Sequence, residues 1–345
     1  MKKITAVISL LLALALLFCA CGKTEPVTPA DTTAPAVPTE PADPAEKAEV
    51  NLGLLKGPTG MGAALLLDEN EKGKARNSYN VTLAGAPDAL QAALISGELD
   101  IAALPTNVAS VLYAKTEGKV QILAVNTLGV LYIMSKDANI KSFADLAGKT
   151  VLSAGQGTTA EYVLNYLLQK NGVTDVNVEF AAEHAEVLTK AAAGDYDTVL
   201  LPEPFVTQMK NTDVSFETVL DLTAEWKALG GGALTMGCIA VRKAFADENP
   251  GAVEDFLSDY EESIGYVNAS PAEAAQLIET YEIAKAAIAE SALPRCNITF
   301  MSGETMKENV SAYLGVLAEA NPQSVGGKLP DDGFYYIALS LADAK

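Results

Sequence analysis

The chain has 345 residues, of which 49% are hydrophobic, and its formal net charge is −20. This length and apolar content are sufficient for two domains with sizeable cores. The acidic balance excludes nucleic acid as a partner, because binding it requires basic patches, and it disfavours a body that lies on anionic lipid.

The first residues predict an export signal. A pair of lysines precedes an apolar run, residues 4–18, which is shorter than the ~20 residues that span a bilayer. The run leads into Leu-Phe-Cys-Ala-Cys-Gly, residues 17–22, which resembles a bacterial lipoprotein box. Cys21 is expected to carry the lipid because the small residue Ala20 precedes it. Residues 1–20 are therefore expected to be a lipoprotein signal peptide, with an ordinary secretory signal as the alternative.

A linker is expected after the signal. Residues 21–49 contain the lipid anchor site and a stretch rich in Pro, Thr and Ala, with too few large apolar residues to build a core. The protein is therefore expected outside the cytoplasm, tethered by lipid to the outer face of the bacterial cell membrane.

The next part of the chain alternates between strands and helices. Strands are predicted at 50–56, 79–84, 101–104 and 120–127, and helices at 61–71, 88–95 and 107–114. A second series has strands at 130–135, 151–154, 176–181, 198–201 and 218–222, and helices at 160–170, 185–193 and 205–210. The remainder is predicted to form one strand at 234–242 and helices at 252–267, 271–281, 285–292 and 304–320.

One stretch of the chain occurs twice. Residues 86–107 and 183–204 both read as an amphipathic helix, a Gly stop, a short apolar strand and a Pro turn that opens another helix. The duplication predicts two similar α/β lobes. Ligands of α/β sheets bind outside the carboxyl ends of the strands, so a cleft between the two lobes is the expected binding site.

The order of the elements predicts two crossings between the lobes, near 127–131 and near 232–237. Lobe 1 is then residues 50–128 plus 236–345, and lobe 2 is residues 129–235, inserted within lobe 1. Lobes that are joined by two crossings typically close over a ligand by hinge bending.

Several motifs, in this order, carry a family resemblance. They are the lipoprotein box, Gly-Glu-Leu-Asp-Ile-Ala at 97–102, Phe-Ala-Asp-Leu-Ala-Gly-Lys-Thr-Val at 143–151 and Leu-Pro-Glu-Pro at 201–204. Together they resemble the extracellular solute-binding proteins of bacterial ABC importers, in the group that includes sulfonate, nitrate and thiamine-precursor (pyrimidine) binders. The resemblance implies a two-lobe type II periplasmic-binding-protein, or Venus-flytrap, fold. It also implies a monomer that delivers a small molecule to permease and ATPase subunits.

The candidate ligand contacts lie in loops at equivalent strand ends and at the first crossing. They are Thr59, Gly60, Met61, Thr106, Asn107, Asn126, Gln156, Thr158, Thr159, His184 and Glu203. Free N–H groups and hydroxyls at helix starts can hold a polar or anionic group. The same threonines could instead be simple helix caps.

Glu203 and His184 also have an alternative role that does not involve ligand. Glu203 in the cleft would favour a cationic or N–H-rich ligand, whereas a solvated Glu203 would only complement a helix dipole. His184, the only histidine, could contact ligand or could be a surface or capping group. Lys56 is the only cation expected near the cleft, so a neutral or weakly charged ligand is favoured over a strongly anionic one.

Cys238 and Cys296 remain after processing, and they could form a disulfide or stay as two buried thiols. One histidine and two remote cysteines offer no metal site, and no cofactor motif or Gly-x-Ser-x-Gly elbow occurs. The chain is therefore expected not to be an enzyme. Two alternatives remain: an enzyme of the same fold, of the pyrimidine- or menaquinone-pathway type, and a ligand-sensing lipoprotein.

Overall fold

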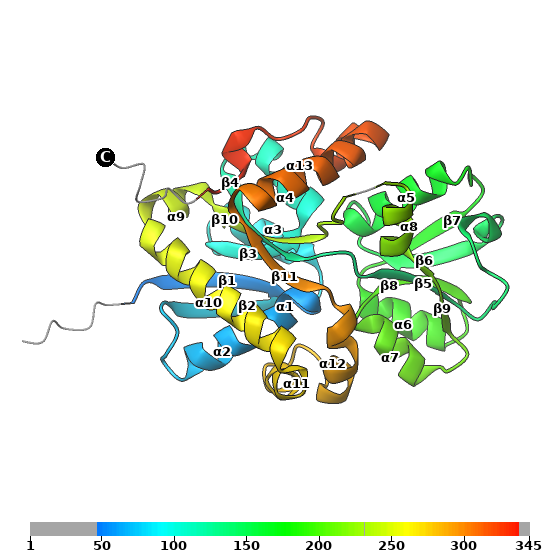
Figure 1. Ribbon diagram of the computed structural model, residues 1–345, viewed down its shortest axis with the longest axis horizontal. Coiled ribbons are helices and arrows are strands. Elements are labelled where there is room, and N and C mark those ends of the chain that lie inside the picture. The colour runs from blue at the N-terminus through cyan, green and yellow to red at the C-terminus, as the bar shows by residue number, and fades with distance from the viewer. Residues whose placement is uncertain (1–46, 231, 338–345) are drawn as a thin grey trace, which may run out of the picture. The chain divides into compact units, whose positions relative to one another are not determined.

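Two β-sheets, each covered by helices, form the part of the chain that the computed structural model describes, residues 47–230 and 232–337 (Figure 1). The six-stranded sheet has the order β11-β4-β10-β3-β1-β2, and the five-stranded sheet has the order β7-β6-β8-β5-β9. Each sheet with its helices is called a half below. The α/β fold class predicted from the sequence is confirmed.

The six-stranded half takes its elements from both ends of the described chain. Its strands are β1 (Glu49–Leu55), β2 (Ser78–Ala84), β3 (Ile101–Pro105), β4 (Val120–Thr127), β10 (Gly237–Arg242) and β11 (Ile298–Ser302). Its helices are α1 (Pro58–Gly62), α2 (Ala64–Glu71), α3 (Pro87–Ser96), α4 (Thr106–Lys115), α9 (Lys243–Glu248), α10 (Pro250–Ala269), α11 (Pro271–Thr280), α12 (Ala286–Ala292) and α13 (Gly303–Ala320). Short 3₁₀ helices are η2 (Leu293–Arg295), η3 (Pro322–Val325) and η4 (Asp332–Phe334). Strand β1 runs parallel to β2 and β3, whereas β10 runs antiparallel to β3 and β4.

The five-stranded half is continuous in sequence. Its strands are β5 (Leu131–Ser135), β6 (Thr150–Ala154), β7 (Asn177–Ala181), β8 (Thr198–Pro202) and β9 (Glu217–Asp221). Its helices are η1 (Phe143–Leu146), α5 (Thr159–Lys170), α6 (His184–Ala192), α7 (Phe205–Thr212) and α8 (Leu222–Ala228). The chain passes from the six-stranded sheet to this one between β4 and β5, and it returns between β9 and β10.

The repeated stretch forms the same unit in both halves. The first copy is α3, β3 and the start of α4, and the second is α6, β8 and the start of α7. Gly97 and Gly194 both have a φ of 86°, a left-handed conformation that glycine adopts without the cost a side chain would add. Each glycine therefore lets the chain turn sharply from helix into strand.

Alternating side chains of the strands build cores on both faces of each sheet. On β8, Val199 and Leu201 pack with α6 and α7, whereas Leu200 faces the opposite cluster, as the two-residue strand period requires. The cluster that holds Leu200 also contains Leu104 of the six-stranded sheet and Trp226 of α8. One apolar core therefore runs from one half into the other.

Several elements differ from the sequence-based expectation. The helix predicted at 61–71 begins earlier, at Pro58, and is divided at Ala63 into α1 and α2. The five-residue strand β11 was not predicted, because so short an edge strand shows little periodicity. Helices α8 and α9, of seven and six residues, were not predicted, because helices of two turns or fewer show little periodicity.

The hypothesis of a disulfide between Cys238 and Cys296 is wrong for this structure, in which both are free, buried thiols. The two side chains belong to separate hydrophobic clusters. Burial raises the pKa of Cys238 to about 12, and it also raises the pKa of Cys296. Both thiols are therefore uncharged parts of the core.

The predicted signal peptide, Cys21 and the linker up to residue 46 lie outside the described residues. Across residues 47–230 and 232–337, no helix is both long enough and apolar enough to span a bilayer.

Candidate functional site

Asn107 joins the two halves where their strand-end loops meet. Its Nδ2 donates to the carbonyl oxygen of Gly157 at 3.1 Å, and its Oδ1 accepts from Thr159 Oγ1 at 3.0 Å. Asn107 lies in the first turn of α4 in the six-stranded half, whereas Gly157 lies just before α5 and Thr159 is its first residue. Tyr313 of α13 donates to Thr159 Oγ1 at 3.2 Å. The structure thus brings together the predicted site residues Asn107 and Thr159, both of which are buried.

Asn126, at the end of β4, is held in a fixed orientation by Tyr260. Tyr260 Oη donates to the carbonyl oxygen of Thr59 at 3.2 Å, so it must accept the bond from Asn126 Nδ2 at 3.1 Å. This arrangement leaves Asn126 Oδ1 as a buried acceptor without a partner. A side chain at Gly237 would place its Cβ 2.7 Å from that oxygen, so glycine is needed there.

Three further buried hydroxyls without a hydrogen-bond partner lie at neighbouring strand ends, after β3, at the end of β4 and before β10. They belong to Thr106, Thr127 and Thr235. Met236, which follows Thr235, joins these segments through its backbone, because its carbonyl oxygen accepts from Thr106 N and its N–H donates to the Thr127 carbonyl, both at 3.0 Å. Buried polar groups are normally paired, so this group of unsatisfied atoms needs an explanation such as a bound ligand or water.

Glu203 is buried, so the alternative of a solvated acid that only complements a helix dipole is wrong. It follows β8 and has 0% exposure. Its Oε2 accepts from Thr207 N at 3.1 Å and from Thr207 Oγ1 at 2.9 Å, and its Oε1 accepts from Arg295 Nε at 2.7 Å. The expectation that Lys56 is the only cation near the cleft is therefore wrong, because Arg295 reaches a cleft-loop carboxylate.

His184 lines a cavity of about 220 Å³ between the halves. The imidazole packs on Phe205, with ring centroids 5.2 Å apart, and its buried Nδ1 has no partner. Burial lowers the pKa of His184 to about 4, so the ring is neutral at physiological pH. The rest of the lining is Lys56, Gly57, Gly85, Glu183, Ala185, Pro204, Gln208, Ile283, Ala284, Lys285 and Ile288.

Among the other predicted contacts, Thr158 and Thr59 bond backbone groups that are close to them in sequence. Thr158 caps α5, since its Oγ1 accepts from Ala160 N. The Thr59 hydroxyl donates to the Leu55 carbonyl, and a Cβ at Gly60 would lie 2.6 Å from that same oxygen. Met61 packs in the core with 0% exposure, whereas Gln156 is exposed.

Three residues of the site were missed by the sequence reasoning: Tyr260, Arg295 and Tyr313. All three belong to the C-terminal helical part of the chain, more than 50 residues after the last predicted loop contact, Glu203. Nothing in a single sequence places these helices next to the cleft. The one available signal was the scarcity of arginine, since an acidic chain with three arginines can be expected to use each of them.

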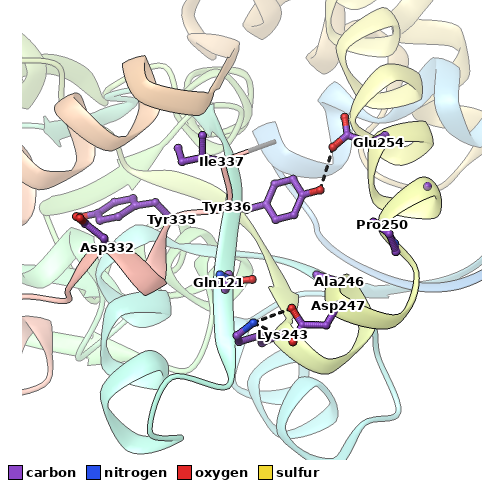
Figure 2. A pocket seen from close by; sticks show the side chains of 11 residues that line it. Gln121, Lys243, Ala246, Asp247, Pro250, Glu254, Asp332, Tyr335, Tyr336 and Ile337 are labelled. Atoms are coloured by element: carbon purple, nitrogen blue, oxygen red, sulfur yellow. Dashed lines mark hydrogen bonds and ion pairs between the residues drawn. The ribbon is translucent and has the colours of Figure 1, made fainter. Parts of the chain in front are cut away.

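A cavity of about 940 Å³ lies elsewhere in the six-stranded half (Figure 2). Gln121 lines it near the amino end of β4, opposite the end that carries Asn126. Four of its polar residues are engaged with one another: Lys243 bonds Asp247 at 2.6 Å, and Tyr336 Oη donates to Glu254 at 2.9 Å (Figure 2). We therefore place the candidate site at the cleft between the halves. Within the described ranges, no group of His, Cys, Asp and Glu could hold a metal ion.

The comparisons with known proteins agree with this fold. The family described as ABC transporter, phosphonate, periplasmic substrate-binding protein matches residues 72–292. Proteins of this description are the substrate-binding components of ABC transporters. Because the match covers more than half of the chain, the chain belongs to this family of periplasmic substrate-binding proteins.

Solved structures show the same fold. An ABC transporter protein from Parabacteroides distasonis is 25% identical, with a TM-score of 0.69 over 84% of this chain and 99% of that one. The alkanesulfonate-binding protein SsuA from Xanthomonas axonopodis pv. citri, bound to MOPS, is 18% identical, with a TM-score of 0.67 over 83% and 96%. The periplasmic nitrate-binding protein NrtA from Synechocystis PCC 6803 is 17% identical, with a TM-score of 0.61 over 81% and 84%. No curated protein matches the sequence significantly.

Proposed function

We propose that the chain captures a small organic molecule in the cleft between its two halves and delivers it to the permease of an ABC importer. The observation that carries this proposal is the contact of Asn107 with Gly157 and Thr159, which joins a strand-end loop of one half to that of the other. In this proposal the halves are lobes, residues 50–128 plus 236–345 and residues 129–235, that close by hinge bending.

The polar groups of the cleft favour a ligand that is neutral or weakly charged. The unsatisfied atoms of Thr106, Asn126 and Thr235 are uncharged, and Asn126 Oδ1 requires a donor. Arg295 is engaged by Glu203 and Thr207, so it is not free to hold an anion. The structural relatives nevertheless include binders of alkanesulfonate and nitrate, so anions belong in any ligand screen.

Ligand capture is tested by thermal unfolding of the intact chain with alkanesulfonates, nitrate, phosphonates and pyrimidines. A ligand at ~100 times its dissociation constant adds ~2.7 kcal/mol, which corresponds to a shift of roughly 5 °C in the unfolding midpoint. The Asn107→Ala variant is expected to lose most of this shift, because the loops from the two halves are no longer joined.

The matched control for this experiment is Asn171→Ala. Asn171 is an exposed residue that follows α5, at the opposite end of this helix from Thr159. Its side chain donates to the Leu167 carbonyl. This variant should keep the full ligand-induced shift. A ligand shift that survives unchanged in Asn107→Ala would move the site away from this cleft, and the absence of any shift would argue against capture of these ligand classes.

We also propose that the protein acts outside the cytoplasm, anchored by lipid at Cys21. Support comes from the residues that resemble a lipoprotein box and from the family, whose members are periplasmic. Metabolic labelling with a tagged fatty acid should mark the wild-type protein and not the Cys21→Ala variant. Equal labelling of both would rule out this anchor, and release of the variant from membranes would support it.

The enzyme alternative has no support from the comparisons, because the matching family and the structures named above are transport proteins.

A further inference from the structure

The chain contains three arginines, and each of them bonds a carboxylate that is almost fully buried. The pairs are Arg76–Asp259 at 2.6 Å, Arg242–Asp100 at 2.5 Å and Arg295–Glu203 at 2.7 Å. The carboxylate side chains are 7%, 7% and 0% exposed, respectively. Loss of one partner from such a pair leaves an uncompensated buried charge, so each arginine is needed where it stands.

Arg295–Glu203 is the pair among these three that connects the two halves. Arg76 and Arg242 bond carboxylates within their own six-stranded half, on α10 and just before β3. Arg295 also belongs to the six-stranded half, at the end of η2, but Glu203 follows β8 of the five-stranded sheet. The other two pairs therefore hold one half together, whereas this pair holds one half to the other.

The bonds around Glu203 form a closed ring. Arg295 donates through Nε to Glu203 Oε1 at 2.7 Å and through Nη2 to Thr207 Oγ1 at 2.7 Å. Thr207 Oγ1 in turn donates to Glu203 Oε2 at 2.9 Å. The planar guanidinium makes both bonds at once, which the point charge of a lysine cannot do. If the halves separated, Glu203 would keep only the two donors of Thr207, which lies on α7 in the same half.

We propose that Arg295 acts as a lock, meaning that it stabilises the closed arrangement of the two halves. It holds the halves closed by supplying the positive charge that buried Glu203 needs, and because it occupies this position it excludes cationic ligands from Glu203. In its absence, a guanidinium or primary ammonium ion of suitable size takes its place. This inference rests on the hinge motion of the proposed function but not on ligand capture, and its test uses no transported ligand, so the two can fail separately.

The chain contains its own reporter of closure. Trp226, the only tryptophan, is 1% exposed and lies on α8 of the five-stranded half. Its ring packs on Tyr166 of α5, with centroids 5.0 Å apart, and on Tyr313 of α13 in the six-stranded half, with centroids 5.8 Å apart. Separation of the halves removes Tyr313 and admits water, so tryptophan emission should shift to the red.

The experiment compares Arg295→Ala with Arg242→Ala, without ligand, by small-angle scattering and tryptophan emission. Arg295→Ala is expected to increase the radius of gyration and red-shift the emission, with the ratio of closed to open protein falling at least about tenfold. Arg242→Ala should lose stability but keep both readouts, because its pair lies within one half. Guanidinium chloride at about 20 mM, far below the molar range that unfolds proteins, should restore both readouts of Arg295→Ala. Sodium chloride at the same concentration should not.

Two further variants keep the proposal falsifiable. Arg295→Lys keeps the charge without the planar fork, so its radius and emission should lie between those of the wild type and Arg295→Ala. The double variant Glu203→Gln/Arg295→Ala has no buried charge to satisfy, so guanidinium should leave it unchanged. An Arg295→Ala protein that matches the wild type in radius and emission would overturn the lock. Equal changes in Arg242→Ala, or restoration by sodium chloride, would overturn it as well.

Discussion

Replacing Trp226 with alanine is expected to lower the free energy of unfolding by about 3–5 kcal/mol, the usual cost of emptying a large buried aromatic site. Trp226 is among the largest fully buried side chains, and it packs between Tyr166 and Tyr313 in the core that both halves share. The loss should therefore weaken both the five-stranded half and its contact with α13. Urea unfolding followed by far-UV circular dichroism measures the effect.

Trp226→Phe is the matched control for this substitution. The indole Nε1 is buried without a hydrogen-bond partner, so removing it breaks no bond. Phenylalanine keeps an aromatic ring in the site, and we expect a loss of less than about 2 kcal/mol. Equal losses in the two variants would mean that the ring packing contributes little and that the indole nitrogen has a partner in solution.

Acidification should destabilise the protein through His184. Its pKa is lowered to about 4 by burial, whereas in the unfolded chain it should be about 6.5. Between these values the unfolded state binds a proton that the folded state does not, so stability falls as the pH drops from 6.5 to 4. The shift corresponds to up to about 3 kcal/mol at pH 4. The charged groups that share its cavity are Glu183, Lys56 and Lys285.

His184→Gln separates this contribution from the titration of the carboxylates. The glutamine variant should lose about 3 kcal/mol less than the wild type between pH 7 and pH 4, since it has no imidazole to protonate. Because the chain has one histidine, a nuclear magnetic resonance titration of its imidazole C–H signals gives the folded pKa directly. A value near 6.5, with parallel stability curves for the two proteins, would contradict the prediction.

The fold was largely predictable because its signals are local. The strand predicted at 120–127 has the bounds of β4, and the repeated helix, Gly and strand pattern correctly placed α3, β3, α6 and β8. These elements are defined by apolar periodicity and by glycines at positions with positive φ, which a single sequence displays. Strand β11 is defined instead by its pairing with β4, a contact more than 170 residues away in sequence, and it was missed.

The site was predictable only in part, for the same physical reason. Asn107 and Thr159 could be proposed because both follow the ends of strands, where α/β sheets bind ligands. The environment of Glu203 could not be predicted, because its burial depends on Arg295, which is 92 residues away in sequence. Met61 illustrates the opposite error, since its position in a cleft loop suggested contact with ligand and its side chain packs in the core.

The chain leaves the six-stranded sheet and returns to it at adjacent positions, after it has formed the five-stranded half. Thr127, the last residue of β4, pairs with Gly237, the first of β10, and Met236 N donates to the Thr127 carbonyl at 3.0 Å. The intervening stretch is thus a cassette whose two ends meet. Recombination between related genes could exchange it in a single event while the six-stranded sheet keeps its register. Half of the cleft would then be inherited separately from the other half, and such proteins could acquire new cargo by shuffling as well as by point substitution.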